Sequence, residues 1–372
     1  MIRVLEVNVD DKGFGGVFAF VMNVMRTIDN NKFVLDIAAF EPFEKYEHKN
    51  EINSYGGKVY ECYGNGNFIV KQWNTCCNFY GLLRKEQYAV IHIHSDVGYK
   101  LLLYGLIGKA AGVKNIIVHS HSSGVEGRLR WLKSGLQKIA KPLLSRQNFN
   151  KLACSKLASK WMYTDDAQSG VQIITNGICL NKYRYNPQKQ QKMRESLGIK
   201  PEDKVIGTVA RFSFQKNPEK LLEVFNELLK KDNKYKLLWV GEGPLKDDIV
   251  EQARKLDIHN RIIFYGTSDK VYELYQAIDV FVMTSRFEGL GIVVIEAQAA
   301  GCPCVCADTI PAEAVLSHEY YSVPLDAEVD EWIKKIAIAC GNSKNSKTEK
   351  HCLEKYDINH TVMMLEDIYV NG

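Results

Sequence analysis

Short apolar runs alternate with amphipathic segments along most of the chain. In the first half, runs typical of buried strands lie at Ile2–Val9, Val34–Phe40, Ala89–Ser95, Asn115–His121, Lys151–Ser155 and Val171–Asn176. Between the first two runs, Val17, Phe20, Val21 and Val24 recur at helical spacing. This order of strand, helix and strand predicts helices packed on a parallel sheet.

A second series of the same kind begins after a polar stretch. Residues 181–203 contain Pro187 and many Lys, Gln and Arg residues. Further strand candidates follow at Lys204–Ala210, Lys236–Gly241, Arg261–Gly266, Val280–Ser285 and Cys304–Asp308. We therefore expect an α/β protein with two doubly wound units that meet near this polar stretch.

The composition fits such a protein. A chain of 372 residues exceeds the usual size of one hydrophobic core, and its 46% of hydrophobic residues is typical of a globular protein. The first strand begins at residue 2 without the pattern of a secretion signal. The most apolar stretch, Leu101–Gly108, is far shorter than the roughly 20 residues of a membrane span. We therefore expect a cytoplasmic protein whose ten cysteines are reduced.

The strongest chemical signal lies in the second half, where a glycine-bearing loop joins a strand to a helix. Gly289, Leu290 and Gly291 are expected to open that helix, whose first N–H groups suit a phosphate. Glu288 and Glu296 bracket the site, about 12 Å apart if most of the span is helical. That separation suits hydroxyls at opposite ends of a nucleotide sugar. The alternatives are a solvated loop acid at Glu288 and a salt-bridged helix residue at Glu296.

Two cations follow the strand that ends at Ala210. Arg211 and Lys216 are expected at the same edge of the sheet as the glycine loop. Fixed cations in a water-poor site stabilise a departing nucleoside diphosphate without a metal. Loop cations are more often simply solvated. The interpretation that Arg211 and Lys216 bind a diphosphate therefore depends mainly on the predicted phosphate-binding helix start nearby.

A glycine turn follows the first strand of the chain. The segment DDKGFGGV places Gly15 and Gly16 before a helix, but Phe18 stands where the dinucleotide fingerprint needs a third small residue. A nicotinamide dehydrogenase is therefore disfavoured. We expect Gly15 and Gly16 to let the backbone approach a bound group.

Four histidines end two adjacent strand candidates. His92 and His94 follow one strand, and His119 and His121 the other. Such pairs could ligate a metal, but no further ligand pattern accompanies them, and we expect neither a metal nor another cofactor. His121 is the candidate to touch a sugar, although a hydrogen-bonded core histidine explains the residue equally well.

A basic segment runs from Arg128 to Lys160. No Asp or Glu occurs between Gly127 and Thr164, whereas Leu129, Leu132, Leu136, Ile139 and Leu143 recur at helical spacing beside Trp131. This pattern suits docking on an anionic membrane surface, and it also fits an ordinary surface helix. Nucleic acid is a poorer partner because the basicity is local and no binding motif accompanies it.

These motifs resemble those of the retaining glycosyltransferases of family 4, in the GT-B class. The resemblance is carried by EGLGIVVIE with its two glutamates, RFSFQKN, GEGPL from Gly241 to Leu245, and the TNGI segment. It covers nearly the whole chain and is looser in the first half. GT-B proteins have two Rossmann-like domains facing across a cleft. The resemblance places the acceptor domain at residues 1–184, with a closing helix at 351–372, and the donor domain at 185–350.

The resemblance also implies roles for individual residues. Arg211 and Lys216 would bind the donor diphosphate, the amides of Gly289 and Leu290 would hold phosphate, Glu296 would bind the ribose, and Glu288 would contact the transferred sugar. His121 matches the family histidine, with His119 as the other candidate. Gly16 matches the glycine loop that faces the donor.

The substrates that the resemblance implies are a UDP-sugar and a lipid-linked saccharide. The HSH segment and the sequence DTIPAEAV are similar to those of enzymes that build bacterial capsule or exopolysaccharide at the inner membrane face. A UDP-sugar epimerase, a phosphorylase and a non-catalytic nucleotide-sugar sensor remain as alternatives.

Overall fold

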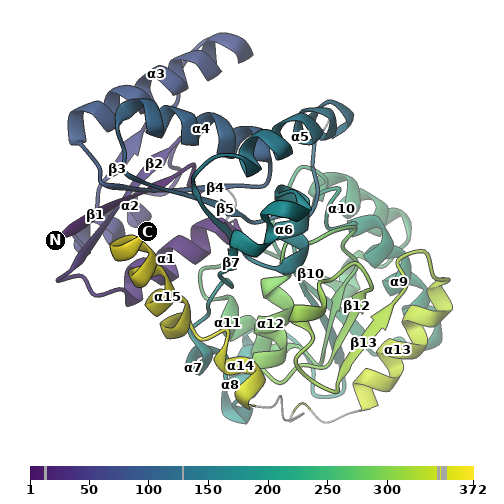
Figure 1. Cartoon of the computed structure of the whole chain (residues 1–372). Coiled ribbons are helices and arrows are strands. Elements are labelled where there is room, and N and C mark those ends of the chain that lie inside the picture. The colour runs from purple at the N-terminus through teal and green to yellow at the C-terminus, as the bar shows by residue number, and fades with distance from the viewer. Residues whose placement is uncertain (12–14, 128–129, 342–343, 345–349) are drawn as a thin grey trace. The chain divides into compact units, whose positions relative to one another are not determined.

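The computed structural model describes residues 1–11, 15–127, 130–341, 344 and 350–372. The chain forms two compact units, which are considered separately here (Figure 1). The first unit consists of Met1–Ile178 and Lys355–Gly372, and the second of Cys179–Glu354.

The first unit is built on seven parallel strands in the order β3-β2-β1-β4-β5-β6-β7. Their bounds are β1 Ile2–Val7, β2 Phe33–Ala39, β3 Val59–Glu61, β4 Val90–Ser95, β5 Asn115–Ser120, β6 Asn150–Ala153 and β7 Val171–Ile173. Every residue of β2, β4 and β5 is buried. Burial on both faces is the property that makes strands of a parallel sheet read as apolar runs.

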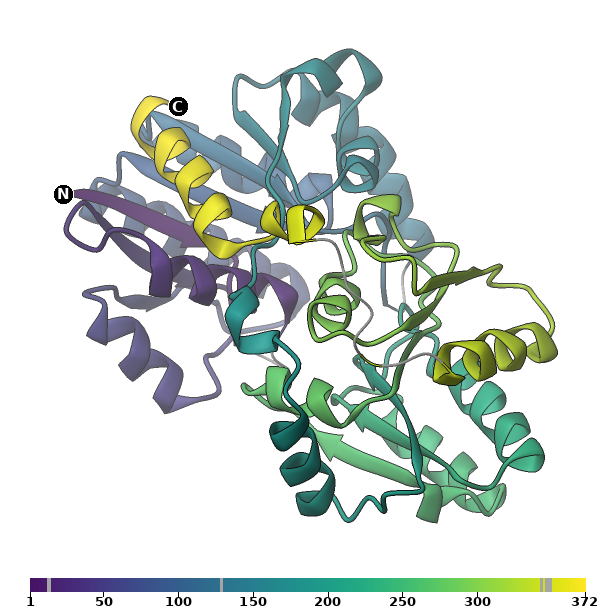
Figure 2. The ribbon, with the colours of Figure 1, turned by 90° about the horizontal axis from the view of Figure 1, so that it is seen from below.

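Helices cover this sheet. They are α1 Gly16–Thr27, α2 Tyr46–Ser54, α3 Phe68–Glu86, α4 Gly98–Ala111, α5 Arg130–Ser145, α6 Lys156–Met162 and α15 Ile358–Asn371. Side chains of α3 and α4 pack with Leu5, Val7 and Ile93 in one core cluster. The C-terminal helix α15 returns to the first unit and lies beside α1, as Figures 1 and 2 show.

The second unit is built on six parallel strands in the order β10-β9-β8-β11-β12-β13. Their bounds are β8 Lys204–Val209, β9 Tyr235–Val240, β10 Ile262–Gly266, β11 Val280–Met283, β12 Cys304–Ala307 and β13 Tyr320–Val323. From β8 the chain adds β9 and β10 on one side, and then β11, β12 and β13 on the other, so the switch point lies between β8 and β11. Ligands bind at such a switch point in open α/β sheets.

The helices of the second unit include short ones. They are α7 Leu180–Tyr183, α8 Pro187–Ser196, α9 Pro218–Lys231, α10 Lys246–Lys255, α11 Val271–Leu274, α12 Ile292–Ala299, α13 Val329–Gly341 and α14 Lys350–Glu354. In the longer helix α9, the local sequence explains where the helix starts and which face is buried. Asn217 takes a left-handed conformation before Pro218 in the first turn, and Leu221 and Phe225 are buried in the core.

The predicted α/β class with two doubly wound units is confirmed. The first boundary lies after Ile178 rather than after residue 184, because α7 belongs to the second unit: the Tyr183 hydroxyl donates to Glu296 Oε1 at 2.8 Å. The return to the first unit comes at Lys355, later than the predicted residue 351.

Candidate active site

The Lys216 ammonium lies against the Glu288 carboxylate. The Nζ–Oε1 distance is 2.6 Å, and the two side chains are only 17% and 7% exposed. The loops that carry them are tied together, since Arg286 Nη1 donates to the Phe214 carbonyl at 2.6 Å and Arg286 N donates to the Gln215 carbonyl at 2.7 Å. The second unit therefore brings together one predicted phosphate ligand and one predicted sugar ligand. The two opposite charges neutralise each other.

Arg211 lies just beyond β8 on an exposed stretch of backbone. Among the described residues, its guanidinium makes no hydrogen bond or ion pair. The GEGP loop braces the adjacent backbone: Phe212 N donates to the Glu242 carbonyl at 3.1 Å, and Leu245 N to the Phe212 carbonyl at 3.0 Å. A Cβ on Gly243 would lie 2.5 Å from the Phe212 carbonyl oxygen, so only glycine permits this contact. The backbone next to Arg211 is thus fixed by hydrogen bonds from the GEGP loop.

Helix α12 begins later than predicted. Gly291 caps the helix with φ of 78°, a left-handed conformation that ends the loop, and the first helical residue is Ile292. Gly289 and Leu290 therefore lie in the loop before the cap, and both are buried. Only the second part of the span from Glu288 to Glu296 is helical, which removes the premise of the 12 Å estimate.

Glu296 projects from α12 toward two tyrosines. The Tyr183 hydroxyl lies 2.8 Å from Oε1, and the Tyr275 hydroxyl lies 2.9 Å from Oε2. Burial raises the pKa of Glu296 to about 7, although both tyrosine hydrogen bonds act to lower it. Glu296 is partly buried, and it forms no ion pair with a described residue, so the alternative of a salt-bridged helix residue is not supported. The two tyrosines are site residues that sequence reasoning missed.

In the first unit, Gly15 and Gly16 open α1. Gly15 is the N-cap, and no described atom lies within 4 Å of a Cβ built on either glycine. Packing against the described residues therefore does not demand glycine here, which leaves room for a ligand to approach the backbone. Residues 12–14 of the same turn lie outside the described residues.

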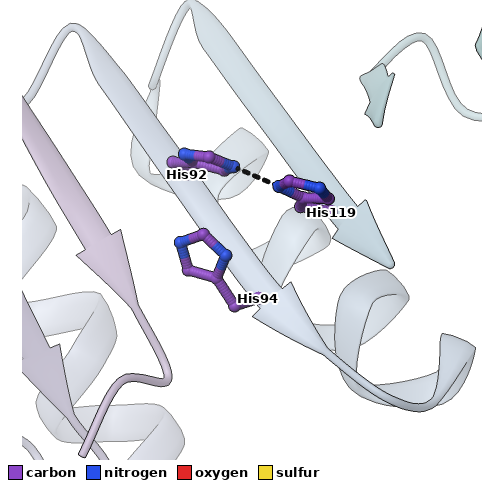
Figure 3. Close-up of side chains that lie close together, drawn as sticks. All are labelled: His92, His94 and His119. Carbon is purple, nitrogen blue, oxygen red and sulfur yellow. Dashed lines mark hydrogen bonds between the residues drawn. The ribbon is translucent and has the colours of Figure 1, made fainter. Parts of the chain in front are cut away.

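The four histidines gather on one face of the first sheet. Figure 3 shows His92 and His94 on β4 and His119 on the neighbouring β5. His92 Nε2 lies 3.1 Å from His119 Nδ1, and His94 Nδ1 lies 2.9 Å from His121 Nε2. His119 is fully buried, whereas His121 is half-buried at the end of the strand. Of the two candidates, His121 is the one with access to solvent.

A buried acid completes this cluster. Glu6 of β1 lies 2.6 Å from His94 Nε2 through Oε2 and accepts from the Tyr369 hydroxyl at 2.9 Å through Oε1. Sequence reasoning missed Glu6, although an acid inside the apolar run of the first strand was an available signal.

His92, His94 and His119 are also close enough to share a metal ion. One potential ligand atom from each lies within 4.8 Å of the others. His92 Nε2 and His119 Nδ1 lie within hydrogen-bonding distance of each other, and both nitrogens of His94 have partners in His121 and Glu6. His119 Nε2, however, is buried and has no hydrogen-bond partner among the described residues, so hydrogen bonding accounts for the grouping only in part.

The first part of the basic segment forms α5, whose apolar stripe is exposed, and the rest includes β6 and most of α6. Trp131 is 75% and Ile139 65% exposed, whereas Gln137, Ala140 and Leu144 face the protein. Arg128 and Leu129 lie outside the described residues. Across the described chain, no helix is both long and apolar enough to span a bilayer.

Two doubly wound parallel sheets, each with its own core, are the architecture of the GT-B fold. Solved structures share the fold. HepE of Anabaena in complex with UDP has a TM-score of 0.76 at 16% identity, covering 100% of both chains. Sucrose-phosphate synthase from Thermosynechococcus elongatus has a TM-score of 0.78 at 16% identity, covering 100% of this chain and 98% of the other.

Residues 189–355 match the family described as glycosyl transferases group 1. The chain is 28% identical over 379 residues to the putative glycosyltransferase EpsF of Bacillus subtilis, covering 99% of this chain and 96% of the relative. It is 24% identical over 322 residues to the UDP-Gal:alpha-D-GlcNAc-diphosphoundecaprenol alpha-1,3-galactosyltransferase of Escherichia coli, covering 82% and 80%.

Proposed function

We propose that the protein transfers a sugar from a UDP-sugar to a lipid-linked saccharide in exopolysaccharide or capsule synthesis, with retention at the anomeric carbon. The observation that carries the proposal is the pairing of Lys216, which follows β8 as Arg211 does, with Glu288, which follows β11. Retention comes from the resemblance to family 4, and the anomer of the product tests it.

The two cations, Lys216 and Arg211, would stabilise the UDP as it leaves. When the bond between the anomeric carbon and the β-phosphate oxygen breaks, its electron pair leaves with the UDP. Lys216 Nζ can exchange Glu288 for this phosphate, because a carboxylate and a phosphate present similar oxygens to an ammonium. Arg211, which has no bonded partner among the described residues, offers a second cation. Placed charges of this kind typically contribute 100-fold or more to the rate.

Glu296 suits the ribose. A carboxylate has about four lone-pair sites, and the two tyrosine hydroxyls occupy two of them. The remaining sites can accept both ribose hydroxyls without displacing a tyrosine. Glu288, released from Lys216, would then be free to accept from a hydroxyl of the transferred sugar.

Named relatives support the acceptor class. The Escherichia coli relative is named for transfer to a diphosphoundecaprenol-linked sugar. Amylovoran biosynthesis glycosyltransferase AmsD of Erwinia amylovora is 35% identical over 114 residues, covering 30% of this chain and 32% of that protein. A lipid-linked acceptor also gives the exposed stripe of α5 a purpose, since apolar side chains flanked by Lys133, Lys138 and Lys141 suit the surface of an anionic membrane.

We propose that no metal takes part. Lys216, Arg211 and the start of α12 carry the charge that a metal would otherwise supply. Transfer should therefore continue at full rate in excess EDTA. Loss of activity in EDTA and its return with Zn²⁺ would instead assign a metal to the histidine cluster.

The function is tested by incubating the protein with each of a panel of radiolabelled UDP-sugars, with and without a polyprenyl-diphosphate saccharide. We expect label to enter the organic phase only when the acceptor is present. Conversion of the donor without acceptor would indicate an epimerase, and binding without any turnover would indicate a sensor. Either result would overturn the proposal.

A further inference from the structure

Glu6 lies in the interior of the first sheet, where an ionised acid is costly unless it is paired. Its side chain is 1% exposed. Burial alone would raise the pKa of Glu6, but its interactions with His92 and His94, hydrogen bonds included, outweigh burial and lower it. Glu6 is therefore an ionised acceptor, and the groups bonded to it must donate.

The orientation of His94 follows from this. His94 Nε2 lies 2.6 Å from Glu6 Oε2, so Nε2 carries the proton of that bond. Burial lowers the pKa of His94 to about 4, which leaves the ring neutral at pH 7 with one proton only. Nδ1 of His94 is therefore bare and can only accept a hydrogen bond.

The same reasoning extends to His121. Its Nε2 lies 2.9 Å from the bare Nδ1 of His94, so the proton in this bond belongs to His121. Burial also lowers the pKa of His121, so this ring is neutral too. Its second nitrogen, Nδ1, is shielded from solvent and has no hydrogen-bond partner among the residues that the structure describes. Glu6, His94 and His121 thus form a relay of hydrogen bonds. Its last ring nitrogen, Nδ1 of His121, carries no proton and accepts no hydrogen bond from a described residue.

We propose that Glu6 and His94 hold His121 in the tautomer protonated at Nε2, so that Nδ1 accepts a hydrogen bond from a hydroxyl of the bound sugar. Glu6 and His94 are positioning residues, and His121 is the one that touches substrate. The inference rests on the proposed function for the identity of the ligand, but the tautomer does not depend on it.

The surroundings keep this relay rigid. Phe20 of α1 packs on both rings, with centroid distances of 5.9 Å to His94 and 5.7 Å to His121. Phe20 is only 2% exposed, so it excludes water from the cluster. On the other side of Glu6, the Tyr369 hydroxyl of α15 donates to Oε1 and lies 2.9 Å from His92 Nδ1. Tyr369 takes no part in the path to His121.

The direct test is a long-range ¹H–¹⁵N spectrum of the full chain without ligand at pH 7, which distinguishes a protonated ring nitrogen from a bare one. The His121→Gln variant assigns the signals of His121. We expect Nε2 of His121 to be protonated and Nδ1 to be bare. Protonation at Nδ1, or at both nitrogens, would overturn the proposal.

Two matched variants test the consequence for transfer. His94→Phe preserves an aromatic ring but removes the acceptor that orients His121, and kcat should fall at least about tenfold with little change in KM for the donor. Tyr369→Phe removes the other hydrogen bond to Glu6, and kcat should stay within about twofold of the wild type. Equal losses in the two variants would mean that the cluster only stabilises the fold, and would overturn the positioning role.

The proposed function and the proposed tautomer of His121 can be refuted independently of each other. If the predicted tautomer is found but no UDP-sugar is turned over, the proposed function fails and the relay stands. If transfer occurs but His121 carries its proton on Nδ1, the relay fails and the function stands. If His94→Phe does not fold, the spectrum of the unaltered chain still decides.

Discussion

At the residue scale, the second unit pairs the two charged residues that we propose to bind the donor. Lys216 and Glu288 are both largely buried and 2.6 Å apart. Removing one partner of such a pair leaves the other without its counter-charge, which is more costly than removing both. Sequence reasoning alone treats Lys216 as a loop cation whose loss leaves the fold intact. Because Lys216 is paired with a buried carboxylate, we expect its loss to lower the stability of the fold as well.

Lys216→Ala should therefore lower both activity and stability. We expect transfer to fall at least about 100-fold, because the departing phosphate loses its cation. We expect the free energy of unfolding of the second unit to fall by about 1 to 3 kcal/mol, because the Glu288 carboxylate loses its partner. Steady-state kinetics and calorimetry measure the two effects.

The double variant Lys216→Ala with Glu288→Gln is the control for that prediction. A neutral amide needs no cation, so the double variant should regain stability over Lys216→Ala while transfer stays lost. A return of transfer in the double variant would show that Lys216 acts only by neutralising Glu288.

Glu296 gives the second unit a pH dependence. Its folded pKa of about 7 lies above the value near 4.3 of an unfolded chain, so the native state holds a proton that the unfolded state releases. The stabilising contribution of the neutral carboxyl group is complete below about pH 4 and is lost as the pH rises through 7. Glu296→Gln stays neutral, so calorimetry should find it more stable than the wild type at pH 8. No gain at pH 8 would contradict the raised pKa.

The candidate site could be predicted from sequence only in part, for a physical reason. Arg211, Lys216, Glu288 and Glu296 belong to local motifs whose spacing is visible in one stretch of sequence. Tyr183 lies more than a hundred residues from its partner Glu296, and Glu6 lies almost a whole chain from Tyr369. Those pairings depend on packing that no local pattern encodes.

At the scale of elements, the GEGP loop holds the backbone beside Arg211. Gly243→Ala would place a Cβ 2.5 Å from the Phe212 carbonyl oxygen and 2.7 Å from its nitrogen, and neither backbone atom can move freely. We expect the free energy of unfolding to fall by at least about 1 kcal/mol and donor affinity to weaken. Gly341→Ala, where no described atom lies within 4 Å of the new Cβ, should change neither. Similar effects in both variants would argue against the bracing role.

Helix α5 offers a prediction about membrane contact. Ile139→Ser removes an apolar side chain that is 65% exposed among lysines, so binding to vesicles rich in phosphatidylglycerol should weaken about threefold or more. Ile338→Ser, on α13 of the second unit at 52% exposure, is the matched control and should bind normally. Co-sedimentation at low and high salt measures both. Equal binding by the two variants would assign the membrane contact, if any, to another surface.

The pattern of apolar runs predicted the interior strands and the edge strands β7 and β10, and missed the other edge strand of each sheet. The misses are β3 and β13, which contain three and four residues and are only partly buried. An edge strand is covered less completely, so its sequence lacks the continuous apolar run that marks a central strand such as β2. Helix α12 likewise began later than predicted, because the left-handed Gly291 interrupts the pattern.

At the scale of the whole molecule, each unit has its own sheet and its own hydrophobic core. The family match covers residues 189–355, which is nearly all of the second unit, and leaves the first unit outside it. This division agrees with the chemistry. The second unit carries the charges that we propose to bind a nucleotide diphosphate, and the first carries the histidine cluster and the exposed face of α5.

The central claim is that Lys216, the start of α12 and Glu296 together form the site for UDP. A crystal structure of the protein with UDP tests it most directly. We predict that the diphosphate replaces Glu288 as the partner of Lys216 Nζ and that the ribose hydroxyls donate to Glu296. Ordered UDP bound away from the loop between Ser285 and Ile292, with Lys216 still paired to Glu288, would contradict the account.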